Sequence, residues 1–171
     1  MATLTHHFIG QLRNEIVQKA ALAGRAEADA REAARTMATE SEKKEDGRVA
    51  IEFGNLAKGH AARSREAQKE LQLLDTFVQR GLPELSPESA VCLGAIVDVA
   101  TEDERGTWER TFIILPVGAA TELEGPGGDG FVTVVTPASP VGKALLGRRS
   151  GDVVDVTINR EPFEWEVLSV S

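Results

Sequence analysis

Apolar and small residues recur with a seven-residue period over the first 80 positions of the chain. In the first part of this stretch one seam position holds Ile9, Ile16, Ala23, Ala30 and Met37, and the other holds Leu12, Lys19, Ala26, Ala33 and Glu40. The second part alternates spacings of three and four through Ala57, His60, Ser64, Ala67, Leu71, Leu74 and Val78. No proline interrupts either part, because the first one is Pro83. The pattern predicts two long helices packed along a coiled-coil seam.

The two seams match each other in reverse order, which predicts an antiparallel hairpin. Ile9 would face Val78 and Ile16 would face Leu71, so the chain turns near residues 43–48. Asp46-Gly47 is expected to break the first helix near Lys44, and the tip is either a tight turn or a loop that includes Arg48–Phe53. The middle of the seam holds mainly alanine and serine, which bury little area, so the distal half is expected to be only marginally stable.

The two outer ends of the hairpin carry different signals. Met1–His7 is expected to be a frayed tail, with Thr5 as a candidate N-cap of the first helix. The second helix is expected to end near Arg80, because Gly81 is a natural helix stop and Pro83 follows it.

The hydrophobic period changes from helical to alternating after residue 90. Alternation predicts strands over 91–100, 108–115, 131–135, 152–158 and 163–170. Between the third and the fourth lies one short helix, with Ser139 at its N-cap, Pro140 at its first position and Gly147 after its last turn. The predicted class is α+β: a helical hairpin over 1–81, a linker over 82–89, and a small antiparallel sheet domain with one short helix over 90–171.

Charge is distributed unevenly between the two halves. Residues 1–80 hold 13 Lys or Arg against 12 Asp or Glu, whereas residues 81–171 hold 6 against 15, which gives +1 and −9 within the total of −8. An acidic domain repels phosphate, so direct DNA binding is not expected and a basic protein surface is the expected partner.

Composition excludes several other classes of site and location. The single cysteine, Cys92, rules out an internal disulfide and is expected to be a buried small hydrophobe. His6, His7 and His60 are not spaced as zinc ligands, and the first two are expected in the solvated tail. No apolar run approaches 18 residues, so no membrane association is expected and the cytoplasm is the default location.

The second half carries the most specific motif in the chain. Ser139-Pro140-Val141-Gly142-Lys143-Ala144-Leu145-Leu146-Gly147-Arg148, followed by Gly151-Asp152-Val153-Val154-Asp155-Val156, resembles the C-terminal signature of the bacterial Gre family of transcript cleavage factors. The order of hairpin, acidic tip, linker and sheet is also similar to that family.

The resemblance implies a fold and a mode of action. It implies an FKBP-like C-terminal domain that docks on the rim of the secondary channel of RNA polymerase, with Ser139, Pro140, Val141 and Lys143 as the docking residues. It implies that the hairpin enters the channel, near the RNA 3′ end. Tip acids then help to hold Mg²⁺ in the polymerase active site, since a hard dication takes carboxylate oxygens. Such a factor is not itself an enzyme and binds no metal stably alone.

The tip departs from the family run Gly-Asp-Leu-X-Glu-Asn-Ala-Glu-Tyr. In the best ungapped register, Asp46 keeps the first acid and Glu52-Phe53 corresponds to the supporting Glu-Tyr pair. The second metal-directed Glu is replaced by Val49, which has no donor atom, and the neighbouring Glu45 is the candidate substitute. The Asn is replaced by Ala50, and Ala138 stands where the family commonly has an Asp before Ser-Pro.

Several interpretations remain open at the level of the sequence. Within the Gre-like hypothesis, the tip either still supports cleavage or occupies the channel without it, as an inhibitor or modulator. Outside that hypothesis, Asp46-Gly47 could simply be residues that favour a turn. Glu42, Glu45 and Glu52 could be solvent-exposed residues at the ends of the helices. A peptidyl-prolyl isomerase or chaperone would need an aromatic cup, for which this chain offers only Trp108, Phe112, Phe131, Phe163 and Trp165. An oligomerising coiled coil is the third alternative.

Overall fold

The computed structural model describes residues 2–40, 44–103, 106–128, 130–158 and 160–171. In order along the chain, the elements are α1 (Ala2–Glu40), α2 (Lys44–Gln79), β1 (Ile96–Asp103), β2 (Gly106–Ile114), β3 (Glu122–Glu124), β4 (Phe131–Val135), α3 (Pro140–Leu145), β5 (Val153–Ile158) and β6 (Glu161–Val170). Packing groups them into two compact units, Asn14–Gln72 and Met1–Arg13 with Leu73–Ser171. The predicted architecture of a helical hairpin and a sheet domain with one short helix is confirmed.

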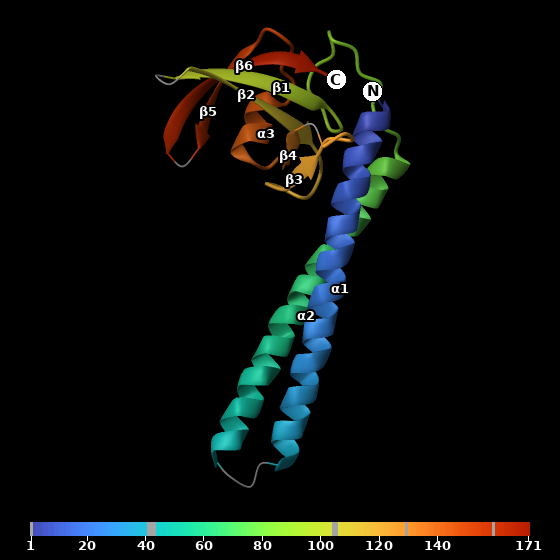
Figure 1. The fold of residues 1–171 in the computed structure, drawn as a ribbon, viewed down its shortest axis with the longest axis vertical. Coiled ribbons are helices and arrows are strands. Elements are labelled where there is room, and N and C mark those ends of the chain that lie inside the picture. The colour runs from blue at the N-terminus through green and yellow to red at the C-terminus, as the bar shows by residue number, and fades with distance from the viewer. Residues whose placement is uncertain (1, 41–43, 104–105, 129, 159) are drawn as a thin grey trace. The chain divides into compact units, whose positions relative to one another are not determined.

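The hairpin unit, Asn14–Gln72, consists of the C-terminal part of α1 and the N-terminal part of α2, which run side by side (Figure 1). The predicted seam is confirmed, because the buried residues of the described part of this unit all lie on it: Ile16, Ala23, Ala30, Ala57 and Ala67. Lys19 is a seam residue that is not buried, since its side chain is 63% exposed and its ammonium group lies 4.0 Å from the carboxylate of Glu15. Four of the five buried seam residues are alanine, so the hairpin unit buries little large apolar surface.

Helix boundaries near the tip differ from the prediction. α1 ends at Glu40 and α2 begins at Lys44, so the connection lies at residues 41–43, which are outside the described residues. Asp46-Gly47, predicted to break the first helix, belongs instead to the first turn of α2, and Arg48–Phe53 is helical rather than part of a loop. A glycine in a helix costs only about 1 kcal/mol relative to alanine, which an otherwise helix-favouring sequence can absorb.

The N-terminal prediction was also wrong, because α1 begins at Ala2 and so includes residues that were expected to form a frayed tail. Thr5 lies inside the helix and is only 6% exposed, so it is not an N-cap. His7 is half-buried, with its ring 5.6 Å from the ring of Phe8. These residues are ordered by tertiary contacts, which local sequence signals do not report.

The sheet unit contains one six-stranded sheet with the order β3-β4-β2-β1-β6-β5. Four neighbouring pairs are antiparallel, as predicted, whereas β2 and β4 are parallel. β1 begins at Ile96, five residues later than expected, and the three-residue strand β3 was not predicted at all. Three residues are too few for alternation to be recognised in a sequence.

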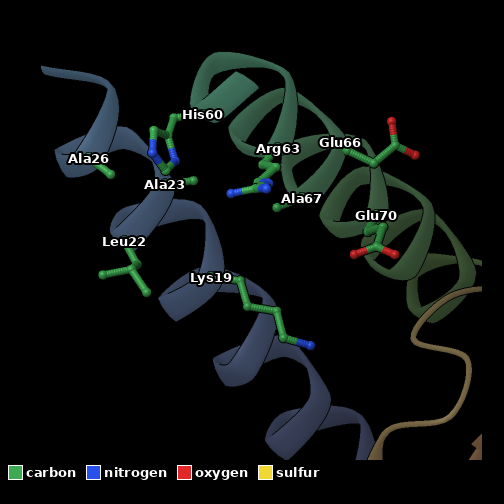
Figure 2. Close-up of a pocket in the computed structure, with 9 residues that line it drawn as sticks. All are labelled: Lys19, Leu22, Ala23, Ala26, His60, Arg63, Glu66, Ala67 and Glu70. Carbon is green, nitrogen blue, oxygen red and sulfur yellow. The ribbon is translucent and has the colours of Figure 1, made fainter. Parts of the chain in front are cut away.

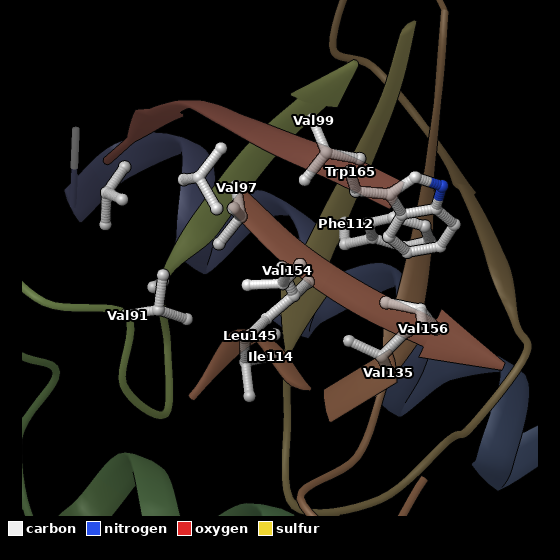
Figure 3. Packing of buried hydrophobic residues seen from close by; sticks show 13 residues of the cluster. Val91, Val97, Val99, Phe112, Ile114, Val135, Leu145, Val154, Val156 and Trp165 are labelled. Atoms are coloured by element: carbon white, nitrogen blue, oxygen red, sulfur yellow. The ribbon is translucent and has the colours of Figure 1, made fainter. Parts of the chain in front are cut away.

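One face of the sheet and α3 enclose a hydrophobic core (Figure 3). The rings of Phe112 on β2 and Trp165 on β6 stack within this core, with centroids 5.3 Å apart. Leu145 of α3 and Val154 and Val156 of β5 belong to the same cluster. Alternation along the strands directs these side chains to one face, and α3 covers them.

The opposite face of β2, β3 and β4 carries a second set of fully buried residues, Ile113, Leu123 and Val134. The first turns of α1, which belong to the same compact unit, contact the segments beside these strands. The side chain of Leu12 lies against Gly118, where an added methyl group would come within 2.6 Å of Leu12 Cδ1. Gly118 also has a φ of 82°, so both the space and the backbone conformation favour glycine there.

A side-chain amide ties α1 to strand β3. Gln11 Nε2 donates to the carbonyl oxygen of Glu124 at 2.6 Å, and the Glu124 N–H donates to Gln11 Oε1 at 3.0 Å. The amide of Gln11 thus bonds both main-chain groups of one residue, as a neighbouring strand would.

The end of α2 follows the predicted stop signal. α2 ends at Gln79, and Gly81 adopts a φ of 87°. Farther along, Gly94 lies against the rings of Phe77 and Pro83, where an added Cβ would be 3.0–3.2 Å from ring carbons. The predicted boundaries of the linker, 82–89, stay a prediction.

We predict that Leu74→Ala lowers the free energy of unfolding by about 2–5 kcal/mol, because Leu74 is completely buried. Leu73→Ala is the matched control, since Leu73 is 55% exposed and its truncation removes little buried area. Urea denaturation followed by circular dichroism measures both changes. Equal losses in the two variants would contradict the described packing of α2.

Candidate functional site

The signature segment, residues 138–152, is built around the N-terminus of α3. Ser139 is the N-cap: its Oγ accepts a hydrogen bond from the Gly142 N–H at 3.0 Å and donates to the Thr136 carbonyl at 2.7 Å. Pro140 occupies the first helical position, where its missing N–H costs nothing. The helix signature expected from the sequence is therefore confirmed at its N-terminal end.

Gly142 is required by the same turn. An added Cβ would lie 2.0 Å from the Thr136 carbonyl oxygen, which is backbone and cannot move aside cheaply. Any larger residue would separate α3 from the end of β4. Ser139 and Gly142 in the signature segment thus serve the local fold.

The four predicted docking residues lie at the N-terminal end of α3. Pro140 and Lys143 are exposed, whereas Ser139 and Val141 are half-buried. Val141 packs against the hydrophobic core together with Ala144 and Leu146. The structure therefore brings the four residues together, but it leaves mainly Pro140 and Lys143 available on the surface.

Hydrogen bonds anchor the C-terminal end of the signature segment to the stretch of chain before β1. The Gly147 N–H donates to the Val91 carbonyl at 2.8 Å, and the Val91 N–H donates to the Arg148 carbonyl at 2.7 Å. The guanidinium of Arg149 donates to the Glu88 carbonyl, and the Arg149 N–H donates to the carboxylate of Asp152 at 2.8 Å. This end of the segment is closed by main-chain pairing.

Two exposed cations beside α3, Arg148 of the quoted motif and Arg149 directly after it, were not predicted as docking residues. Arg148 and Arg149 are exposed, as is Lys143, and these are three of the six Lys and Arg residues of the half 81–171. The clustering of half of the cations of an acidic domain in seven residues was the available signal. We call Pro140, Lys143, Arg148 and Arg149 the signature surface.

A shallow groove of about 410 Å³ lies between α1 and α2 in the hairpin unit (Figure 2). Its floor contains the small residues Ala23, Ala26 and Ala67, and Lys19 stands where a large seam residue would otherwise fill the space. The alanine seam and the charged seam position together explain why the groove exists. It was not predicted.

The tip is described only in part. The backbone of residues 44–47 is helical, but the side chains of Glu45 and Asp46 lie outside the described residues, so their predicted roles are not tested. Val49 and Phe53 are half-buried, and Glu52 is exposed. Position 49 follows position 46 by three residues in one continuous helix, less than one turn away.

Comparison with known proteins identifies the family. Residues 86–171, half of the chain, match the family described as "Transcription elongation factor, GreA/GreB, C-term". The chain is 30% identical over 130 residues to the transcription elongation factor GreA of Helicobacter hepaticus. The aligned region covers 71% of this chain and 74% of that protein. The chain belongs to the GreA/GreB transcription elongation factor family.

A second relative agrees with this assignment. GreA of Mycolicibacterium smegmatis is 35% identical over 120 residues, covering 61% of this chain and 69% of that protein. Among solved structures, GreA factor homolog 1 (Gfh1) of Thermus thermophilus is 18% identical and covers 93% of this chain and 94% of that chain, with a TM-score of 0.39. The signature segment lies entirely inside the region that matches the GreA/GreB family.

The five aromatic residues considered for a prolyl-isomerase cup differ in their surroundings in this GreA/GreB family member. Phe112 and Trp165 are stacked inside the core, and Phe163 is partly buried against it. Trp108 and Phe131 are exposed, on β2 and β4 respectively. The two stacked rings serve packing.

Titratable groups of the described residues offer little independent chemistry. Cys92, expected to be buried, is half-buried, and this partial burial raises the pKa of its thiol, which keeps the thiol protonated near neutral pH. The parts of the chain that the structure describes contain no group of three His, Cys, Asp or Glu placed to hold a metal ion. Within those same parts, no helix is both long and apolar enough to cross a membrane.

We predict that Gly142→Ala destabilises the sheet unit by about 1–3 kcal/mol, because the new methyl group must displace the Thr136 carbonyl. Gly59→Ala is the control, since nothing lies within 4 Å of its Cβ position in α2, and a stability equal to or about 1 kcal/mol above that of the parent is expected. Denaturant titration followed by fluorescence of Trp108 and Trp165 and by circular dichroism gives both values. A Gly142→Ala variant with the same free energy of unfolding as the parent would contradict the described turn.

Proposed function

We propose that this protein regulates transcription elongation by binding RNA polymerase at its secondary channel. The sheet domain would dock on the channel rim, and the hairpin tip would reach toward the active-site magnesium. The observation that carries the proposal is the GreA/GreB family match over 86–171, which contains the complete signature segment. The proposed location is the cytoplasm, where the polymerase acts.

The signature surface supplies a physical basis for docking. Lys143, Arg148 and Arg149 present positive charge on a domain that is otherwise strongly acidic. Such a local concentration of charge steers association with an acidic patch of a partner and makes affinity depend on salt. The domain as a whole keeps a net charge of −9 over residues 81–171, so its acidic parts would suit the basic surface expected from the sequence.

The tip acids would act on chemistry that belongs to the polymerase. A magnesium ion held there would supply activation of water for cleavage of backtracked RNA. Carboxylate oxygens are the ligands that Mg²⁺ prefers, and Asp46 and Glu45 are the acids of this chain proposed to approach it. On this proposal the chain contributes carboxylates and positioning, and has no catalytic centre of its own.

A second candidate function is that of a channel-binding modulator that does not stimulate cleavage. Val49 favours it, because valine has no atom that can coordinate a metal at the position of the second family acid. Both functions share the same docking and differ only at the tip. The two functions are therefore distinguished by whether the protein stimulates RNA cleavage, and not by its affinity for the polymerase.

We predict that Val49→Glu raises cleavage of RNA in stalled, backtracked elongation complexes above the level of the parent protein. Val49→Gln is the matched control, because it has similar size but no charge and should leave cleavage unchanged. Asp46→Ala should abolish any stimulation that the parent shows while leaving binding to polymerase nearly intact. If neither Val49→Glu nor Asp46→Ala changes cleavage, the tip is not directed at the metal and the modulator function is favoured.

We predict that Lys143→Glu weakens binding to core RNA polymerase about three- to tenfold at low salt, as expected for roughly 1 kcal/mol from one exposed interface charge. Arg110→Glu makes the same charge change at an exposed position of β2, outside the signature surface, and should bind like the parent. Titrations at two salt concentrations measure both. Equal weakening by the two variants would show that only the net charge matters, and would count against docking through α3.

A further inference from the structure

The sheet has two edge strands, β3 and β5, and they differ in whether other parts of the chain hydrogen-bond to their free edges. At the β3 edge, the amide of Gln11 bonds both main-chain groups of Glu124. Strand β5 pairs with β6 over its full length, from Val153 to Ile158. Among the described residues, no hydrogen bond joins the other side of the β5 backbone to any loop, helix or side chain.

Apart from the charge of Asp155, strand β5 lacks several of the features by which edge strands are usually protected. Five of its six residues are β-branched, and its register with β6 is continuous, without a bulge. It contains neither proline nor lysine. A regular edge of this kind is a template for pairing with another extended chain.

Helix α3 covers one face of β5 and leaves the edge open. Val154 and Val156 are buried in the core cluster with Leu145 of α3 (Figure 3). On the other face Val153 is 54% exposed, and Asp155 and Thr157 are exposed as well. We call this second face, over β2, β1, β6 and β5, the outer face.

The outer face is acidic next to the open edge. In one cross-strand row, Asp155 of β5 is paired with Glu164 of β6. In the next row, Val153 of β5 is paired with Glu166 of β6, which is paired with Ala100 of β1, which in turn is paired with Glu109 of β2. All four of these carboxylates are on exposed residues. At the outer-face positions of the four strands, as far as the structure describes them, there is no lysine or arginine.

This charge pattern selects the kind of chain that can add to β5. A second copy paired edge to edge would bring its own acidic strand next to Asp155, and like charges on facing strands are destabilising. A strand with Lys or Arg at alternate positions would instead place a cation beside Asp155, with Glu164 one strand farther into the sheet. We propose that β5 accepts an extended basic segment of a partner protein by β-strand addition. This site uses a different element from the signature surface on α3.

The test uses the full-length, isotope-labelled protein and the synthetic peptide acetyl-(Lys-Val)₄-amide. Titration followed by NMR should shift the amide signals of Val153–Ile158 and slow their hydrogen exchange, because new main-chain hydrogen bonds form along the edge. A peptide of the same sequence with alternate amides N-methylated keeps its charge but loses one row of donors. It should bind at least tenfold more weakly.

Charge and occupant are tested separately. Asp155→Lys should reduce affinity for the Lys-Val peptide at least tenfold, and Glu164→Lys serves the same purpose if the first variant does not fold. Signals that shift elsewhere, no binding, or equal affinity of the methylated peptide would overturn strand addition. A dimer by light scattering that is lost in a variant of the β5 edge would show that the occupant is a second copy, and would overturn the proposed basic partner.

Discussion

The packing of the first turns of α1 against the sheet unit is the constraint on which much of that unit depends. Leu12 fills the space that Gly118 leaves, and Gln11 bonds the backbone of β3. A strand of three residues has few main-chain bonds of its own, so the bonds from Gln11 add to its pairing with β4. The same contacts explain why the helix begins at Ala2, before any local start signal.

The sequence predicted those parts of the fold whose causes are local and periodic. The seam residues such as Ile16 and Ala67 were found because a heptad repeats over many turns, and α3 was found because Ser139, Pro140 and a following glycine mark its ends. β3 and the N-terminal turns were missed because long-range contacts determine them. The glycine at 47 misled the tip prediction, because propensity is a weak signal inside a long helix.

The candidate site shows a similar division. The family motif could be read from the sequence, yet Ser139, Gly142 and Leu145 serve the cap, the turn and the core. What the motif offers to a partner is the small remainder on its exterior, including the two arginines that letter-by-letter comparison did not single out. A motif recognised as functional can therefore be largely a folding motif, with binding carried by the exposed residues among it.

The alanine seam of the hairpin unit also makes arm length a modular property. Because the seam repeats every seven residues on both helices, removing one heptad from each arm between Asn14 and Gln72 would preserve every remaining pairing. Each such step would shorten the arm by about 10 Å, at 1.5 Å per residue. The length of the hairpin can therefore change in steps of one heptad per helix, without changes to the residues at either end.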